Sequence, residues 1–113
     1  MTDATAIPDQ PPTRQAITLD IAYAQDLAVR EPAGESADQV RERLRTAIRA
    51  LVDDAERYAS GLADSRARDI ALETVRHART VAEDPVGNPE ANLRLLANAA
   101  KSVSRYARPV ATA

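Results

Sequence analysis

The sequence predicts an all-α protein, a four-helix antiparallel (up-down) bundle with a disordered N-terminal leader. Three observations support this fold class. Apolar residues recur every three or four positions in four segments, which is the period of an amphipathic helix. Short stretches that contain proline, glycine or helix-capping residues separate these segments. No stretch alternates apolar and polar residues with the period of two that a strand requires.

The chain has 113 residues and no cysteine, which suits a single domain without disulfide bonds. We expect residues 1–13 to form a disordered leader, because they are polar, rich in proline and unlike a signal peptide. The helical bundle domain is expected over residues 14–108, and a frayed C-terminus over residues 109–113. Because no long apolar run is present, the sequence predicts a cytoplasmic protein without a membrane span.

The first predicted helix covers residues 14–30. Its apolar residues are spaced by four, three and four positions and therefore share one face: Ile17, Ile21, Ala24 and Ala28. Proline and glycine within residues 32–34 are expected to end this helix. One face of the helix should therefore enter the core.

The second predicted helix, over residues 37–60, carries the longest apolar seam. Its members follow one another at spacings of four and three: Leu44, Ile48, Leu51, Ala55, Tyr58 and Leu62. This spacing is typical of a coiled-coil-like interface between packed helices. The seam is therefore expected to form the core of the bundle, to contact a second copy of the chain, or both.

The ends of the second helix carry recognisable signals. Ser36 and Gln39 have the spacing of a capping box, in which each side chain accepts a hydrogen bond from the other residue's backbone N–H. Gly61 is expected just beyond the helix in the left-handed conformation. Asp53 and Arg57 lie four residues apart, so we expect an ion pair between them on the exposed face.

The third predicted helix begins at a cap formed by Asp64 or Ser65 and ends near residue 83, before the proline and glycine of residues 85–87. We expect the following residues to form its apolar stripe: Ala67, Ile70, Ala71, Val75, Ala78, Val81 and Ala82. The short connections on both sides of this helix favour antiparallel neighbours.

The fourth predicted helix has Asn88 as its N-cap and Pro89 at its first position, where the missing N–H has no helical partner to lose. The residues expected on its inner face are Leu95, Leu96, Ala99, Val103 and Tyr106. This helix completes the predicted bundle.

The charge balance argues against nucleic acid as the main partner, because the chain has 15 basic and 17 acidic residues and a net charge of −2. Arginines are nevertheless concentrated at the start of the second helix: Arg41, Arg43, Arg45 and Arg49. Arg41, Arg45 and Arg49 are the candidates for a contact with phosphate or with an acidic partner. Acidic residues at positions 38 and 42 favour instead a solvated, ion-paired face.

Three side chains are candidates for binding a small molecule: Tyr58, His77 and Tyr106. The tyrosines could surround a pocket between helices, although rings that rest on the edge of the core are commoner. His77 is the only histidine, and Glu73 lies one helical turn before it and could orient its imidazole. A histidine without a nucleophile or a second acid makes no catalytic set, so a solvent-facing His77 is favoured.

No catalytic residue, metal site or cofactor is predicted. The adjacent carboxylates at positions 53–54 and 83–84 diverge by about 100° around a helix, so they do not converge on a metal ion. The sequence contains no glycine-rich phosphate loop and no HExxH motif.

Several apolar positions of the predicted helices carry a family resemblance: Ile17, Leu44-Arg45, Ile48, Leu51, Val52, Ala71, Val75 and Ala78-Arg79. In these positions the chain resembles a group of short actinobacterial proteins of unknown function that are labelled as natural-product biosynthesis proteins. The chain departs from that group at Thr46-Ala47, where members often carry Gly and His, and at Asp53, where many carry Pro. The resemblance implies a cytoplasmic helical protein linked to specialised metabolism, and it implies no catalytic residue.

These observations favour a non-enzymatic accessory or interaction protein. We expect it to self-associate as a homodimer or to bind another protein partner. One alternative is a small cofactor-free enzyme or small-molecule carrier of a biosynthetic pathway, with its pocket between helices. A second alternative is a regulator that contacts nucleic acid through the arginines at the start of the second helix.

Overall fold

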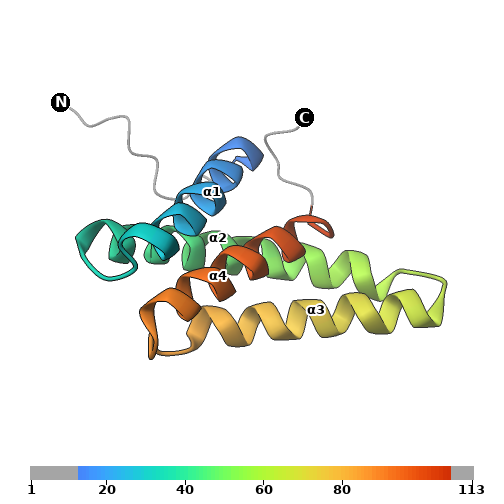
Figure 1. Ribbon diagram of the computed structural model, residues 1–113. Coiled ribbons are helices and arrows are strands. Elements are labelled where there is room, and N and C mark those ends of the chain that lie inside the picture. The colour runs from blue at the N-terminus through green and yellow to red at the C-terminus, as the bar shows by residue number, and fades with distance from the viewer. Residues whose placement is uncertain (1–12, 108–113) are drawn as a thin grey trace.

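The computed structural model describes residues 13–107. Within this range the chain forms four α-helices and no strand, as predicted (Figure 1). The helices are α1 (Arg14–Arg30), α2 (Glu35–Ser60), α3 (Ser65–Glu83) and α4 (Pro89–Ser104). Nearly all of the predicted leader and the predicted frayed C-terminus lie outside the described residues.

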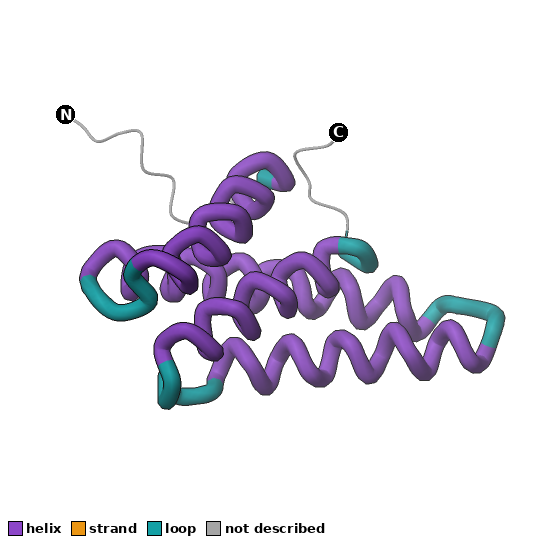
Figure 2. Tube along the Cα trace, in the orientation of Figure 1, coloured by secondary structure: helices purple, strands orange, loops and turns teal. Residues whose placement is uncertain are grey.

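The four helices form two pairs: α2 packs on α3, and α1 packs on α4, which lies across the α2–α3 pair. Helices α2 and α3 lie side by side and run in opposite directions (Figure 2). Helix α4 packs on all three other helices, and α1 packs on α4 and α2. In Figure 1, α1 and α4 are inclined to the long α2–α3 pair. The prediction of four helices is therefore confirmed, whereas a regular up-down bundle with one common axis is not.

Side-chain caps position three of the four helix starts. The backbone N–H of Ala67 donates to Oδ1 of Asp64 at 2.9 Å, and the N–H of Ala91 donates to Oδ1 of Asn88 at 2.8 Å. Thr13 caps α1 in the same way. The predicted caps at Asp64 and Asn88 are confirmed, because a short polar side chain before an apolar helix satisfies a backbone donor that has no partner in the helix.

The capping box predicted at the start of α2 is wrong. The helix begins one residue earlier than Ser36, at Glu35, and its N-cap is Gly34, which makes no side-chain cap. Gly34 has φ +131°, a conformation that side-chain-bearing residues rarely adopt. This glycine lets the chain turn directly into α2, so Ser36 lies inside the first turn and Gln39 donates to Glu35 instead.

The end of α2 also differs from the prediction. Gly61 has φ −88° and ψ −2°, which is right-handed rather than left-handed backbone. The N–H groups of Gly61 and Leu62 donate to the carbonyls of Tyr58 and Ala59, so the last turn simply tightens before the loop. The α2–α3 connection therefore needs no glycine-specific conformation.

The core is built from aliphatic side chains and many alanines. The largest fully buried side chains are Leu44, Ile48, Leu93, Leu96, Val40, Val75 and Val103. Four members of the predicted α2 seam are buried, from Leu44 to Ala55. Alanines such as Ala24, Ala55, Ala97 and Ala100 are completely buried, which allows the helix axes to approach closely. The central seam is thus covered within one chain.

Some predicted core positions face solvent. Ile70 is 54% exposed and Leu95 is 44% exposed, whereas Leu93, which was not predicted, is fully buried. Ala67 and Tyr58 are also exposed, and Leu62 is half-buried. Helix periodicity gives a stripe but leaves its exact phase to the neighbouring helices, so residues at the edge of a stripe are easily misplaced.

Candidate functional site

The structure brings together two of the three predicted ligand-binding residues. Tyr58 belongs to the last turn of α2, and Tyr106 follows the end of α4. Their rings stack with centroids 6.2 Å apart and planes inclined by 29°. Offset ring pairs at this distance attract each other and hold both rings in place. The pair therefore fixes the C-terminal end of α4 against α2.

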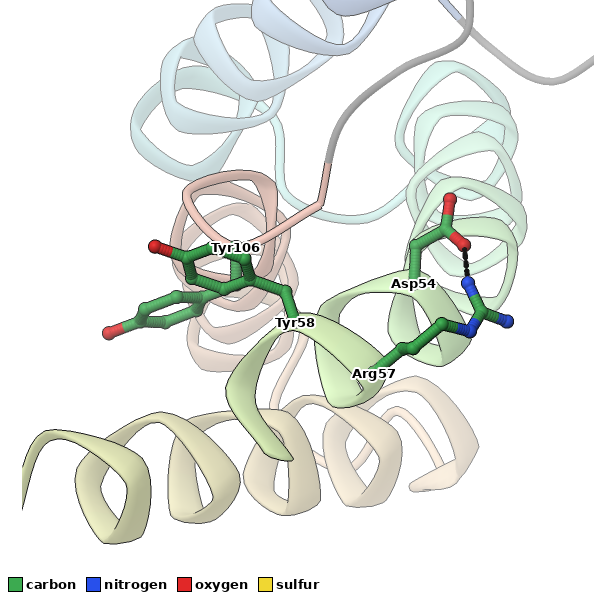
Figure 3. Close-up of a pocket in the computed structure, with 4 residues that line it drawn as sticks. All are labelled: Asp54, Arg57, Tyr58 and Tyr106. Atoms are coloured by element: carbon green, nitrogen blue, oxygen red, sulfur yellow. Dashed lines mark hydrogen bonds and ion pairs between the residues drawn. The ribbon is translucent and has the colours of Figure 1, made fainter. Parts of the chain in front are cut away.

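The stacked tyrosines line an open pocket of about 250 Å³ with Asp54 and Arg57 (Figure 3). Arg57 donates to the Asp54 carboxylate one helical turn away, and not to Asp53 as predicted. Figure 3 shows this ion pair pointing away from the two rings. The pocket therefore offers an aromatic wall that suits a small planar molecule, while the charges of Asp54 and Arg57 are matched within the protein.

His77 lies apart from this pocket. It is exposed on α3, as the solvent-facing interpretation predicted. Glu73, the residue expected to orient the imidazole, forms an ion pair with Arg76. His77 is therefore not part of the tyrosine pocket, and residues 13–107 contain no cluster of histidine and carboxylate side chains suited to a metal ion.

Arg41 is buried, in contrast to the exposed position predicted for it. Its side chain is 3% exposed, and its Nε donates to Oδ1 of Asn92 at 2.8 Å. One terminal nitrogen donates to the Asp38 carboxylate at 2.9 Å. The other donates to the carbonyls of Pro32 and Pro89, at 2.7 and 2.9 Å. Four of the five guanidinium N–H groups are thus used inside the protein.

This network joins distant parts of the chain. Pro32 belongs to the α1–α2 loop, Asp38 to α2, and Pro89 and Asn92 to the first turn of α4. A buried guanidinium is tolerated only when it is paired and hydrogen-bonded in this way. The interpretation of Arg41 as part of a solvated basic face is therefore wrong, and its guanidinium is not presented to a phosphate.

The other two arginines of the proposed contact face also have internal partners. Arg45 has a side chain only 13% exposed and pairs with Glu42, and it donates to the carbonyl of Asp84. Arg49 is half-exposed and pairs with Glu83 of α3 at 3.0 Å. The three arginines follow one face of α2, but that face points toward α3 and α4 rather than forming a free basic surface.

A further ion cluster joins α2 to α3, the two helices of the antiparallel α2–α3 hairpin. Arg79 of α3 donates to Glu56 at 2.7 Å and to Asp53 at 2.9 Å, both on α2. The Glu56 carboxylate, with a smaller contribution from Asp53, raises the pKa of the Arg79 guanidinium above its usual value. Asp53, expected to pair along its own helix, instead bridges two helices.

A family model described as a family of unknown function (DUF6415) matches residues 15–109. No curated protein and no solved structure matches the chain. The match spans all four helices, including the Arg41 network and the stacked tyrosines. The chain therefore belongs to the DUF6415 family, whose function is unknown.

Proposed function

We propose that the protein is a non-enzymatic interaction module that self-associates through the loop end of the α2–α3 hairpin, residues 58–74. The observation behind this proposal is the exposure of large apolar side chains there: Tyr58 is 46% and Ile70 is 54% exposed. No residue from 60 to 70 is buried, although the apolar stripes of α2 and α3 are buried farther from the loop. At this end the stripes continue onto the surface.

The end of α4 accounts for this exposure. Tyr106 lies just beyond α4 and stacks on Tyr58, so the cover that α4 gives to α2 stops at that turn. The loop end of the hairpin extends past the end of α4 (Figure 1). Large apolar side chains that are exposed on such an uncovered end suit a contact surface.

A second copy of the chain is the partner that the charges favour. Asp54 and Arg57, which precede Tyr58, already pair within one chain, so a two-fold contact at this end would bring together two neutral pairs rather than two like charges. The net charge of −2 also gives little repulsion between copies. Because the seam from Leu44 to Ala55 is buried within one chain, the proposed contact is confined to the hairpin end.

Analytical ultracentrifugation of the full chain tests this proposal. We expect a concentration-dependent dimer in the micromolar range, and Ile70→Glu should weaken it about tenfold or more, because a charge would have to enter an apolar contact. Val29→Glu is the matched control. Val29 is also a β-branched, exposed helical residue, at 72% exposure, but it lies on α1.

The outcomes separate the possibilities. A strict monomer at high micromolar concentration would refute self-association. A dimer weakened equally by Val29→Glu and Ile70→Glu would show that the contact lies elsewhere. Both variants change exposed residues, so melting temperatures close to that of the wild type should confirm that they fold.

The tyrosine pocket supports a second candidate function, the binding of a small molecule as a carrier or a cofactor-free enzyme. The observation in its favour is the convergence of Tyr58 and Tyr106 on one opening. Compounds with a planar ring should shift the NMR signals of both tyrosine rings, and Tyr106→Ala should abolish the shift. Ile70→Glu should leave it unchanged, which distinguishes this function from self-association. No ring-current shift from any aromatic compound would refute this candidate.

The biological setting of either function is part of the proposal. The resemblance at apolar positions of α1, α2 and α3 supports an accessory role in actinobacterial natural-product biosynthesis. The cysteine-free sequence suits the reducing cytoplasm. Deletion of the gene, followed by comparison of the secreted metabolites, tests the setting, and an unchanged metabolite profile would contradict it.

A further inference from the structure

A second opening lies between the start of α1 and the end of α4. It has a volume of about 250 Å³ and is separate from the tyrosine pocket. Its apolar side chains are Ile17, which is 3% exposed, and Ile21, which packs against the core. Its charged side chains are Arg14, Lys101 and Arg105. We refer to this opening as the α1–α4 groove.

The three cations of the groove differ from most other cations of the chain. Arg43, Arg49, Arg79 and Arg94, for example, all pair with carboxylates. Within residues 13–107, none of Arg14, Lys101 and Arg105 forms an ion pair, and no carboxylate lines the groove. The groove therefore has a positive rim without an internal counterion in the described part of the chain.

Arg14 has no evident role in stabilising its own helix. It is the first residue of α1, where the helix dipole is positive, and the first turn of α1 contains no acidic residue. Lys101 and Arg105 lie near the negative end of α4, so helix stability alone would explain them. The same explanation fails for Arg14, whose charge adds to a positive helix end rather than offsetting it.

Two hydroxyl groups complete the lining, but their protons are already used. Thr18 donates to the carbonyl of Arg14 at 3.0 Å, and Ser104 donates to the carbonyl of Ala100 at 2.7 Å. They therefore have no free proton for a bound anion. An anion in the groove would depend on the three cations, and an apolar group would rest on the two isoleucines.

We infer that the α1–α4 groove binds a small amphipathic carboxylate. Its apolar body would lie on Ile17 and Ile21, and its carboxylate would meet the positive rim. The volume is below the roughly 300–1,000 Å³ of pockets for drug-sized ligands, so the ligand should be smaller than these. A cationic rim over an apolar floor favours a molecule with both kinds of surface over either a bare anion or a neutral alcohol.

Titration of the full chain with hexanoate, monitored by NMR, tests this inference. We expect saturable shifts in the millimolar range at Ile17, Thr18 and Ile21. Hexanol and inorganic phosphate, which each lack one half of the chemistry, should bind at least about tenfold more weakly. Arg14→Gln should weaken hexanoate binding about tenfold, since a charge-assisted contact is lost. Arg66→Gln is the control, because Arg66 is also exposed near a helix start but lies on α3.

Each contrary result is specific. The absence of saturable shifts with hexanoate would overturn the inference, as would equal binding by Arg14→Gln and the wild type. Equal binding of hexanol would remove the role of the cations, and equal binding of phosphate would remove the role of the isoleucines. Because Arg14 is exposed, the variant should fold normally, and unchanged NMR signals on α3 would verify this.

Discussion

Nε of Arg41 donates a hydrogen bond to Oδ1 of Asn92, 2.8 Å away, and both side chains are buried although they lie 51 residues apart in the sequence. The same guanidinium reaches the carbonyls of Pro32 and Pro89. One side chain on α2 therefore satisfies a backbone carbonyl of the α1–α2 loop, and a backbone carbonyl and a side-chain amide in the first turn of α4. These contacts hold the start of α2, the α1–α2 loop and the start of α4 together.

Loss of the Arg41 guanidinium should destabilise the fold strongly. Arg41→Met keeps much of the side-chain volume but leaves the buried Asn92 amide oxygen and two part-buried carbonyls without this donor, and an orphaned buried group costs about 1–3 kcal/mol. We expect a loss of about 3 kcal/mol or more in the free energy of unfolding, measured by urea denaturation. Arg43→Met should cost less than about 1 kcal/mol, because Arg43 is half-exposed in its pair with Asp20. Equal losses in the two variants would contradict the network.

The central position of Leu51 predicts a large truncation effect. Leu51 is 3% exposed, so Leu51→Ala should cost about 2–5 kcal/mol in unfolding free energy through lost burial and a cavity. Leu95 offers a matched comparison, because it is the same residue type at 44% exposure on α4. Leu95→Ala should cost about 1 kcal/mol or less. A cost below about 0.5 kcal/mol for Leu51→Ala would show that this seam is not the core.

Asp64, which caps α3, and Ser36, which does not cap α2, should respond differently to substitution by alanine. Asp64→Ala removes the acceptor for the Ala67 N–H and should cost about 0.5–2 kcal/mol. Ser36→Ala should change the stability by no more than about 0.5 kcal/mol, because Ser36 lies inside the helix and does not cap it. Thermal denaturation of both variants at one pH provides the comparison. A larger loss of stability for Ser36→Ala than for Asp64→Ala would show that Ser36 does cap α2.

The Asp26–Arg30 pair on α1 predicts a measurable shift in titration. The hydrogen bond from Arg30 lowers the pKa of the Asp26 carboxyl below its usual value. The folded state therefore favours the ionised form, and this contribution is present above about pH 3.9 and is lost as the pH falls through the lowered pKa. NMR titration should place the Asp26 pKa lower in the wild type than in Arg30→Gln. Identical titration curves would contradict the pair.

The sequence predicted the helix ends correctly where nearby side chains determine them. Residue bounds of α1 and α3, and the caps at Asp64 and Asn88, depend on side chains within one turn of the helix end. The error at the start of α2 has a local cause too, because Gly34 at φ +131° gives the chain a route into the helix that Ser36 does not need to cap. The sequence shows that a glycine is present, but it does not show which backbone conformation that glycine adopts.

The candidate sites were harder to predict, because they depend on which helices meet. Arg41 looked like a surface charge because its partners Pro32, Pro89 and Asn92 are backbone carbonyls and an amide, none of which carries a signal in the sequence. The two tyrosines were predicted as candidates, but only the position of α4 brings their rings together. Asn92, which no pattern singled out, could have been found as a polar residue within the buried stripe of α4.

The stacked Tyr58–Tyr106 pair has a practical consequence, because the chain has three tyrosines and no tryptophan. Two of its three ultraviolet chromophores therefore sit at one junction, where α4 ends against α2. Near-ultraviolet circular dichroism and intrinsic fluorescence of the unlabelled chain should report mainly on that junction. In a Tyr23→Phe chain the tyrosine signals would come from the stacked pair alone. The contact between the end of α4 and α2 could then be followed without an added label.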